Sequence, residues 1–127
     1  MRNDEPFLSF YQKECTRTLR DDISLIRAEP CIQRDTLLNM ALGLTGESGE
    51  IVDQIKKFAY QGHTLDKKGM TEELGDVLWY LNNICNILEI EMEDVIRHNV
   101  DKLRTRYPDG FSEECSRKRV DVEVQND

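Results

Sequence analysis

Apolar residues recur in steps of three and four along most of this chain, and this spacing constrains the fold more than any other feature. The clearest example is residues 70–88, where one apolar stripe follows a helix of about 3.6 residues per turn. Weaker versions of the same pattern cover residues 7–26, 35–61 and 92–107. The sequence therefore predicts an all-α protein with four helices.

Residues at the ends of these segments agree with the helical assignment. Asp35 suits the N-cap of the second helix, and Gly62 suits its end. A proline-containing turn ends the fourth helix before Phe111, and the sequence beyond it is polar. We predict one domain over residues 1–111 and a flexible polar tail over residues 112–127, in which alternating valines would form at most a short strand.

Length and composition favour a single compact domain. The chain has 127 residues, and 39% of them are hydrophobic, which is enough for a small core. A chain of this size often gains stability when it buries an apolar face against a second copy. We therefore expect a homodimer or a homotetramer.

The charge and the cysteines exclude several classes of protein. A net charge of -8 argues against binding to a nucleic-acid polymer, but it allows a small phosphorylated ligand if cations reverse the local field. The apolar runs are too short for a membrane span. The four cysteines form no CxxC pair and no signal peptide is evident, so we expect reduced thiols in a cytoplasmic protein. Cys85 falls on an apolar stripe and is predicted to be a core residue.

Two pairs of acids border the apolar stripes of consecutive helices. Glu47 and Glu50 lie about 60° apart on the second helix, and Glu73 and Asp76 share one face of the third. If the two helices pack antiparallel, all four carboxylates converge and repel one another. Bound cations relieve such repulsion, and oxygen-only ligands suit Mg²⁺, with Mn²⁺ as the alternative.

Other interpretations of these acids are simpler or different. The chain contains 25 acidic residues, so acids spaced three apart also arise by chance on a solvated face. A di-iron site requires Glu followed three residues later by His, but Tyr60 and Val95 stand three residues before the two histidines.

Gly46 precedes the first acidic pair, and Gly49 lies between its two members, inside a predicted helix. Each glycine lowers helix stability by about 1 kcal/mol relative to alanine. We hypothesise that the small residues let another backbone or a phosphate group approach closely.

The segments GLTGESGEIVDQIKKF, EELGDVLWYL and NVDKLRTRYPDGF resemble the MazG-like, all-α nucleotide pyrophosphohydrolases. The family pattern is Glu-x-x-Glu, a spacer and Glu-x-x-Asp, which Glu47, Glu50, Glu73 and Asp76 match in order. The resemblance extends over about residues 8–111. Longer members often carry a further Glu where this chain has Gly46.

The resemblance implies a four-helix bundle that is completed by dimerisation. It also implies Mg²⁺-dependent hydrolysis of a nucleoside triphosphate to monophosphate and pyrophosphate. The four acids would hold the metal, and Glu47 or Glu50 would take the proton from the attacking water. The resemblance further implies that Asn99 and Lys102 contact the phosphates or the sugar.

Helical-wheel positions add further candidates. Lys57 lies near the angle of Glu50 and would contact phosphate, unless it is only an exposed charge. Tyr80 and Asn83 follow Asp76 on its face and would contact substrate, although Tyr80 also suits half-buried packing.

Two further residues have alternative roles. Trp79 suits either base stacking or a subunit interface. A salt bridge is the favoured role of Arg106.

Two other functions remain open at this stage. A phosphoribosyl-ATP pyrophosphohydrolase would share the fold and the acidic pattern. A non-enzymatic helical module would use the acidic face to bind a basic partner. If the chain is an enzyme of either kind, Mg²⁺ should raise its melting temperature, whereas a non-enzymatic module predicts no such rise.

Overall fold

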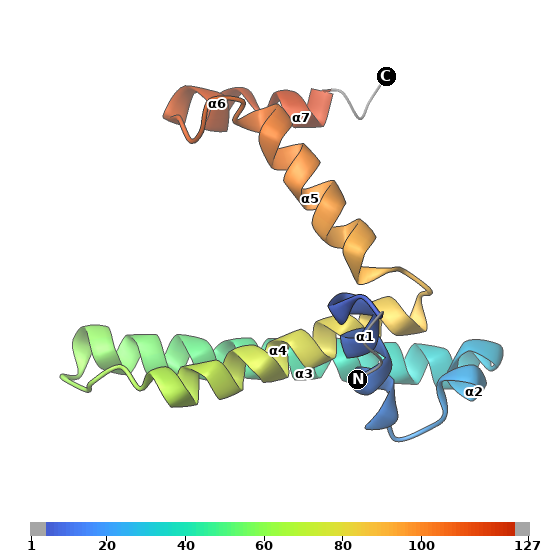
Figure 1. Cartoon of the computed structure of the whole chain (residues 1–127). Helices are drawn as coiled ribbons and strands as arrows, with labels where there is room; N and C mark the ends of the chain where they lie inside the picture. The colour runs from blue at the N-terminus through green and yellow to red at the C-terminus, as the bar shows by residue number, and fades with distance from the viewer. Residues whose placement is uncertain (1–4, 124–127) are drawn as a thin grey trace. The chain divides into compact units, whose positions relative to one another are not determined.

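A computed structural model describes residues 5–123, all in helices, turns or irregular segments, with no strand among them (Figure 1). The predicted all-α class is confirmed. The chain forms two compact units that divide between Ile90 and Glu91. None of the helices in residues 5–123 combines the length and hydropathy that a membrane-spanning segment needs.

The helical stretch predicted over residues 7–26 is two helices. α1 spans Phe7–Arg17 and α2 spans Ile23–Ala28. Between them Asp22 caps α2, because its carboxylate accepts a hydrogen bond from the Ser24 backbone N–H at 2.9 Å. Aspartate competes with helical backbone bonding in this way, and the apolar spacing alone does not register the interruption.

α3 spans Pro30–Tyr60, so it begins five residues before the predicted N-cap at Asp35. In any helix the backbone N–H of the first residue has no partner within the helix. Proline lacks this N–H, so it is accepted at the first position without loss of a hydrogen bond. The predicted end is confirmed, since Gly62 adopts a positive φ of 71° just after the helix. α3 has 31 residues and is therefore about 46 Å long.

α4 spans Lys67–Ile87 and lies alongside α3 (Figure 1). Asp66 caps it by accepting a hydrogen bond from the Lys68 backbone N–H at 3.0 Å. The helix starts three residues before the predicted Met70. The polar segment between Tyr60 and Lys67 turns the chain back on itself, so α3 and α4 run antiparallel.

The hydrophobic core of this unit centres on Ile26, Met40 and Ile87, which come from α2, α3 and α4. The prediction for Cys85 is confirmed, because its side chain is 6% exposed. All four cysteines are free thiols.

Polar contacts hold α1 on α4. The Asn83 amide donates to the Cys15 carbonyl at 3.1 Å, and the Asn86 amide donates to the Gln12 carbonyl at 2.9 Å. Asn83 is fully buried and Asn86 is 7% exposed. These amides therefore bind backbone groups in a place where water cannot compete.

The C-terminal unit contains α5, Met92–Arg106, followed by α6, Glu113–Lys118, and α7, Val120–Glu123. The Arg106 guanidinium donates two hydrogen bonds to the Asp121 carboxylate, at 2.7 and 2.6 Å. The favoured salt-bridge role of Arg106 is thus confirmed. Hydrogen bonds from Arg106 also hold the pKa of Asp121 below its usual range.

The described part of the predicted polar tail is largely helical, so no strand forms there. Val124 and the residues after it lie outside the described range. The predicted boundary between residues 111 and 112, and the flexibility of the tail, stay predictions.

The glycines of α3 differ in the space around them. A Cβ on Gly43 would overlap the ring of Tyr80, so this glycine is what lets α4 approach α3. A Cβ on Gly46 or Gly49 would meet no atom of the chain within 4 Å. Within the described chain, no backbone approaches Gly46 or Gly49, and the close contact lies at Gly43, which meets a side-chain ring. Approach of a phosphate to Gly46 and Gly49 stays a hypothesis.

We predict opposite effects for alanine at two of these positions. Gly46→Ala should stabilise the chain by up to about 1 kcal/mol, because it adds helix propensity in open space. Gly43→Ala should destabilise it by about 1–3 kcal/mol, because the Tyr80 ring must shift. Thermal unfolding followed by circular dichroism measures both. Equal effects would show that the Gly43–Tyr80 contact does not limit helix approach.

Candidate metal centre

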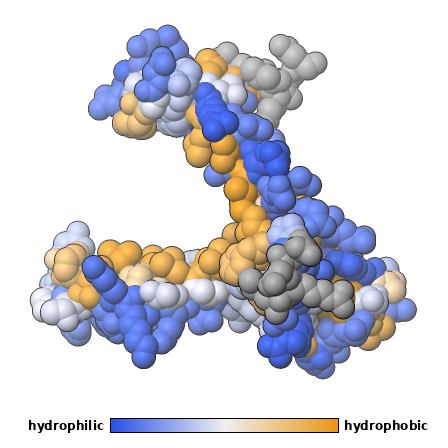
Figure 2. All heavy atoms as spheres, viewed as in Figure 1, coloured by the Kyte–Doolittle hydropathy of each residue, from blue (hydrophilic) through white to orange (hydrophobic). Residues whose placement is uncertain are grey.

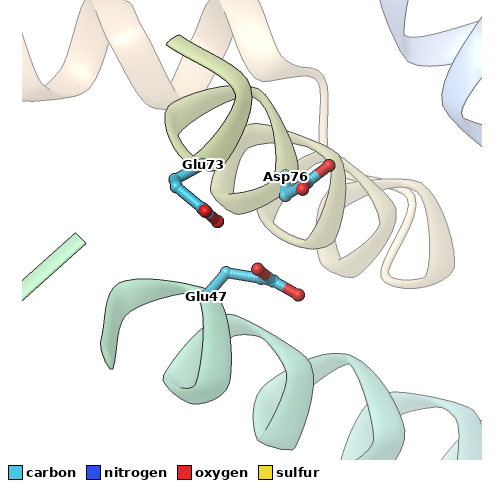
Figure 3. Close-up of side chains that lie close together, drawn as sticks. All are labelled: Glu47, Glu73 and Asp76. Atoms are coloured by element: carbon cyan, nitrogen blue, oxygen red, sulfur yellow. The ribbon is translucent and has the colours of Figure 1, made fainter. Parts of the chain in front are cut away.

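Three carboxylates from two helices meet in the N-terminal unit. Glu47 projects from α3, while Glu73 and Asp76 project from successive turns of α4, and the three point toward one another (Figure 3). One oxygen from each carboxylate lies within 4.8 Å of the others. Glu47 and Glu73 are half-buried and Asp76 is exposed. The antiparallel pairing of α3 and α4 thus brings together acids that are 26 and 29 residues apart in the sequence.

The electrostatics of this group are unfavourable for three ionised acids. The pKa of Glu47 is raised, first by lost hydration and then by the negative charges of Asp76, Glu73 and Glu50. A hydrogen bond between the Glu47 and Glu73 carboxyl groups contributes in the same direction. The group therefore favours a shared proton or a cation.

Glu50 lies one turn beyond Glu47 on α3 and is exposed. It is close enough for its charge to raise the pKa of Glu47, but it is not among the three acids whose oxygens group together. The structure thus brings together three of the four predicted ligands. A role for Glu50 at the metal stays a prediction.

Two residues near the acids were missed from sequence. The Gln54 amide donates to the Glu73 carboxylate at 3.3 Å, which orients Glu73. Gln54 follows Glu47 by seven residues, so the helical wheel does place it on the same face. Burial chiefly raises the pKa of Tyr11 on α1 to about 12, with a smaller contribution from the charge of Asp76. No local sequence pattern indicates that Tyr11 lies near this site.

Lys57 faces a cavity of about 200 Å³ that is also lined by Gln54 and His63. Its ammonium group contacts the Asp53 carboxylate at 2.5 Å, and this contact chiefly raises the pKa of Lys57. Lys57 is therefore a cation already paired with an acid. Its predicted contact with phosphate is untested.

The remaining predicted residues have varied surroundings. Tyr80 is half-buried against Gly43, and its ring packs edge-on against Trp79, with 4.9 Å between the ring centroids. Asn83 is fully buried and holds α1, so the structure gives it a packing role. Asn99 and Lys102 lie on α5 in the C-terminal unit. Substrate binding by these residues stays a prediction.

Comparison with known proteins adds independent findings. Residues 35–111 match the family model of the MazG nucleotide pyrophosphohydrolase domain. The gene 37 protein of Mycobacterium phage L5 is 31% identical over 87 residues, which span 65% of this chain and 76% of the phage protein. No solved structure matches the chain. The matched range contains all four acids and α5, and it excludes α1 and α2.

The raised pKa of Glu47 gives a testable dependence of stability on pH. A carboxylate whose folded pKa is raised contributes stability fully below its unfolded pKa of about 4.3 and loses that contribution as pH rises through the folded value. Without metal, Glu47→Gln should therefore melt at a higher temperature than the natural chain at pH 7. The difference should shrink as pH falls toward about 4. Melting temperatures measured in a chelating buffer across this range test the prediction.

Asp53→Asn is the matched control on the same helix. Hydrogen bonds from Lys56 and Lys57 lower the pKa of Asp53 to about 2. A lowered folded pKa stabilises above the unfolded pKa of about 3.9. This variant should therefore melt at a lower temperature at pH 7. If both variants shift in the same direction, repulsion among the three acids is not significant.

Proposed function

The chain belongs to the MazG nucleotide pyrophosphohydrolase family, and we propose that it hydrolyses ribo- or deoxyribonucleoside triphosphates to the monophosphate and pyrophosphate with Mg²⁺. One observation carries this proposal: Glu47, Glu73 and Asp76 converge from two helices, with one oxygen of each carboxylate within 4.8 Å of the others. A solvated acidic face would instead spread these charges apart.

The three acids suit a divalent cation by their chemistry. They offer only carboxylate oxygens, which Mg²⁺ and Mn²⁺ prefer over softer metals. Burial and the neighbouring negative charges together raise the pKa of Glu47, and a bound cation would offset the repulsion among these charges. When bound, Mg²⁺ supplies a more acidic water and offsets charge on the departing pyrophosphate.

The side chains of the chain then divide the remaining work. Glu47, Glu73 and Asp76 hold the cation, and Gln54 keeps Glu73 in orientation. We assign Glu50 as the general base, because it has no hydrogen-bond or ion-pair partner within residues 5–123 and lies one turn from Glu47. An unpaired carboxylate can accept a proton from the attacking water.

Phosphate contacts would come from Lys57 and from two polar residues of α5. Lys57 lies beside the small cavity next to Gln54, and its ammonium group has three N–H donors, so it can contact a phosphate while it stays paired with Asp53. Asn99 and Lys102 on α5 are proposed as further contacts to phosphate or sugar, by analogy within the family. Tyr80 is proposed to support the substrate through its packing on Trp79.

We also propose that two or four copies assemble. Large apolar side chains remain exposed along α3 and α4, and Figure 2 shows apolar surface following this helix pair. The side chains concerned are between 48% and 65% exposed: Leu42, Val52, Ile55, Phe58, Leu74 and Leu78. Burial of such side chains against another copy would complete a bundle that α3 and α4 only begin.

Removal of a metal-holding carboxylate tests the proposed reaction. Asp76→Asn and Glu50→Gln should each lower pyrophosphate release by at least about 100-fold, as losses of charge stabilisation or of a general base typically do. The helical circular dichroism signal should remain native in both variants. Thr45→Ala serves as a control, because Thr45 is exposed on α3 and its hydroxyl binds only the Ala41 carbonyl. Full activity in Asp76→Asn would exclude the three acids as the reaction centre.

A substrate panel tests the reaction class. Ribo- and deoxyribonucleoside triphosphates and phosphoribosyl-ATP are incubated with Mg²⁺, and the products are separated by chromatography. We expect pyrophosphate and a monophosphate from the nucleoside triphosphates, together with a Mg²⁺-dependent rise in melting temperature. Release of orthophosphate would refute the assigned bond cleavage. Absence of both turnover and Mg²⁺ stabilisation would favour a non-enzymatic acidic module.

A further inference from the structure

α1 lies against α4 in the N-terminal unit (Figure 1), and Tyr11 is one of its half-buried residues. We propose that Tyr11 is a positioning residue of the metal centre, whose hydroxyl oxygen accepts a hydrogen bond from water in the hydration shell of the bound cation. The assignment rests on the proposed function, and it adds a residue that lies outside the family match over residues 35–111.

Hydrogen bonds fix the face of α4 on which α1 docks. The Trp79 indole N–H donates to the Thr18 hydroxyl at 2.8 Å. One turn further along α4, the Asn83 amide donates to the Cys15 carbonyl at 3.1 Å. Asn83 follows Asp76 by seven residues, which is about two helical turns, so both lie on one face. α1 therefore contacts the face of α4 that also carries Asp76.

Tyr11 and Gln12 extend from opposite sides of this contact. On the helical wheel of α1 they lie about 40° and about 60° to either side of Cys15. The Gln12 amide donates to the Ile90 carbonyl at 3.2 Å, beyond the C-terminal end of α4. Tyr11 is therefore on the side of α1 that faces the N-terminal turns of α4, where Asp76 lies. The negative charge of Asp76 accordingly contributes to the raised pKa of Tyr11.

The Tyr11 hydroxyl is held in place while its oxygen stays available. A hydrogen bond joins it to the thiol of Cys15, which is 2% exposed. This bond contributes to the raised pKa of Tyr11 and opposes the effect of burial on the pKa of Cys15, so the phenol is the donor. With its only proton directed at sulfur, the phenol oxygen can act toward other groups only as an acceptor.

An acceptor beside Asp76 suits a hydrated cation better than a phosphate group. Mg²⁺ usually keeps several waters in protein sites, and each of them donates hydrogen bonds. Phosphate oxygens are acceptors, so they would face the Tyr11 oxygen with no proton between them. The phenol also remains neutral at pH 7, because its pKa is about 12. Tyr11 thus adds a hydrogen bond without adding charge to three carboxylates that already repel one another.

Binding of Mn²⁺ without nucleotide is the direct test, because free Mn²⁺ gives an electron paramagnetic resonance signal that weakens on binding. Tyr11→Phe removes only the hydroxyl. It should weaken Mn²⁺ binding about three- to tenfold, which is the usual effect of one hydrogen bond. At a fixed Mg²⁺ concentration, the rise in melting temperature should also be smaller.

Tyr60→Phe is the matched control, because it makes the same chemical change at the C-terminal end of α3, where the tyrosine is 86% exposed. This variant should bind Mn²⁺ as the natural chain does. Circular dichroism confirms that each variant is folded.

A second variant separates positioning from packing. Cys15→Ala removes a buried thiol and keeps the phenol, so it should lower the melting temperature of the metal-free chain. It should nevertheless weaken Mn²⁺ binding less than Tyr11→Phe does. If metal affinity instead falls in step with melting temperature in both variants, Tyr11 acts only through packing and the proposal is overturned.

The outcomes distinguish this proposal from the proposed function. Unchanged Mn²⁺ affinity in Tyr11→Phe, in a chain that binds the metal and releases pyrophosphate, would overturn the role of Tyr11 and leave the reaction standing. A natural chain that binds no Mn²⁺ would overturn both. Weaker binding in Tyr11→Phe, in a chain that releases no pyrophosphate, would support the role of Tyr11 at the metal and refute the reaction.

Discussion

The close packing of α4 on α3 at Gly43 is the constraint on which the candidate site depends. Because Gly43 has no Cβ, the Tyr80 ring rests directly on the α3 backbone. Gly43 precedes Glu47 by one turn, and Tyr80 follows Asp76 by one turn. The separation of the two helices is therefore fixed next to the acids, at the value that lets carboxylates from both helices meet.

The acids and the packing oppose each other energetically. Loss of hydration and neighbouring negative charges raise the pKa of Glu47, so the site destabilises the helix pair that carries it. The hydrophobic core around Met40 and Ile87 and the hydrogen bonds between α1 and α4 compensate for this loss of stability. Such a balance is expected where function requires like charges at close range, since the strain is relieved only when a cation is present.

The sequence predicts the helices and the acids well because both depend on helical periodicity. The apolar stripes indicate α3, α4 and α5, and the spacing of Glu73 and Asp76 places both acids on one face. The break between α1 and α2 was not predicted, since it depends on a side-chain cap at Asp22. The point of contact between α3 and α4 was also inaccessible, because no periodicity reveals that Gly43, rather than Gly46 or Gly49, meets another residue.

Side-chain roles were harder to predict than positions. Asn83 shares a helical face with Asp76. The helical wheel does not show that α1 covers Asn83 and accepts a hydrogen bond from its amide. Glu50 pairs with Glu47 in the sequence pattern, yet a turn of α3 separates it from the three grouped carboxylates. The position of Tyr11 on the side of Asp76 was not foreseen, since only the tertiary packing of α1 on α4 brings these residues together.

The amide N–H groups of Asn83 and Asn86 donate to main-chain carbonyls of α1, and the Asn86 amide oxygen also accepts from the Gln12 side chain. Every residue type supplies such a carbonyl, so these two contacts place no demand on the identity of the α1 residues they hold. Apart from the buried Gln12 and Cys15, the side chains of α1 can therefore change without loss of these two contacts to α4. Substitution at the exposed positions of this helix is thus compatible with a constant fold.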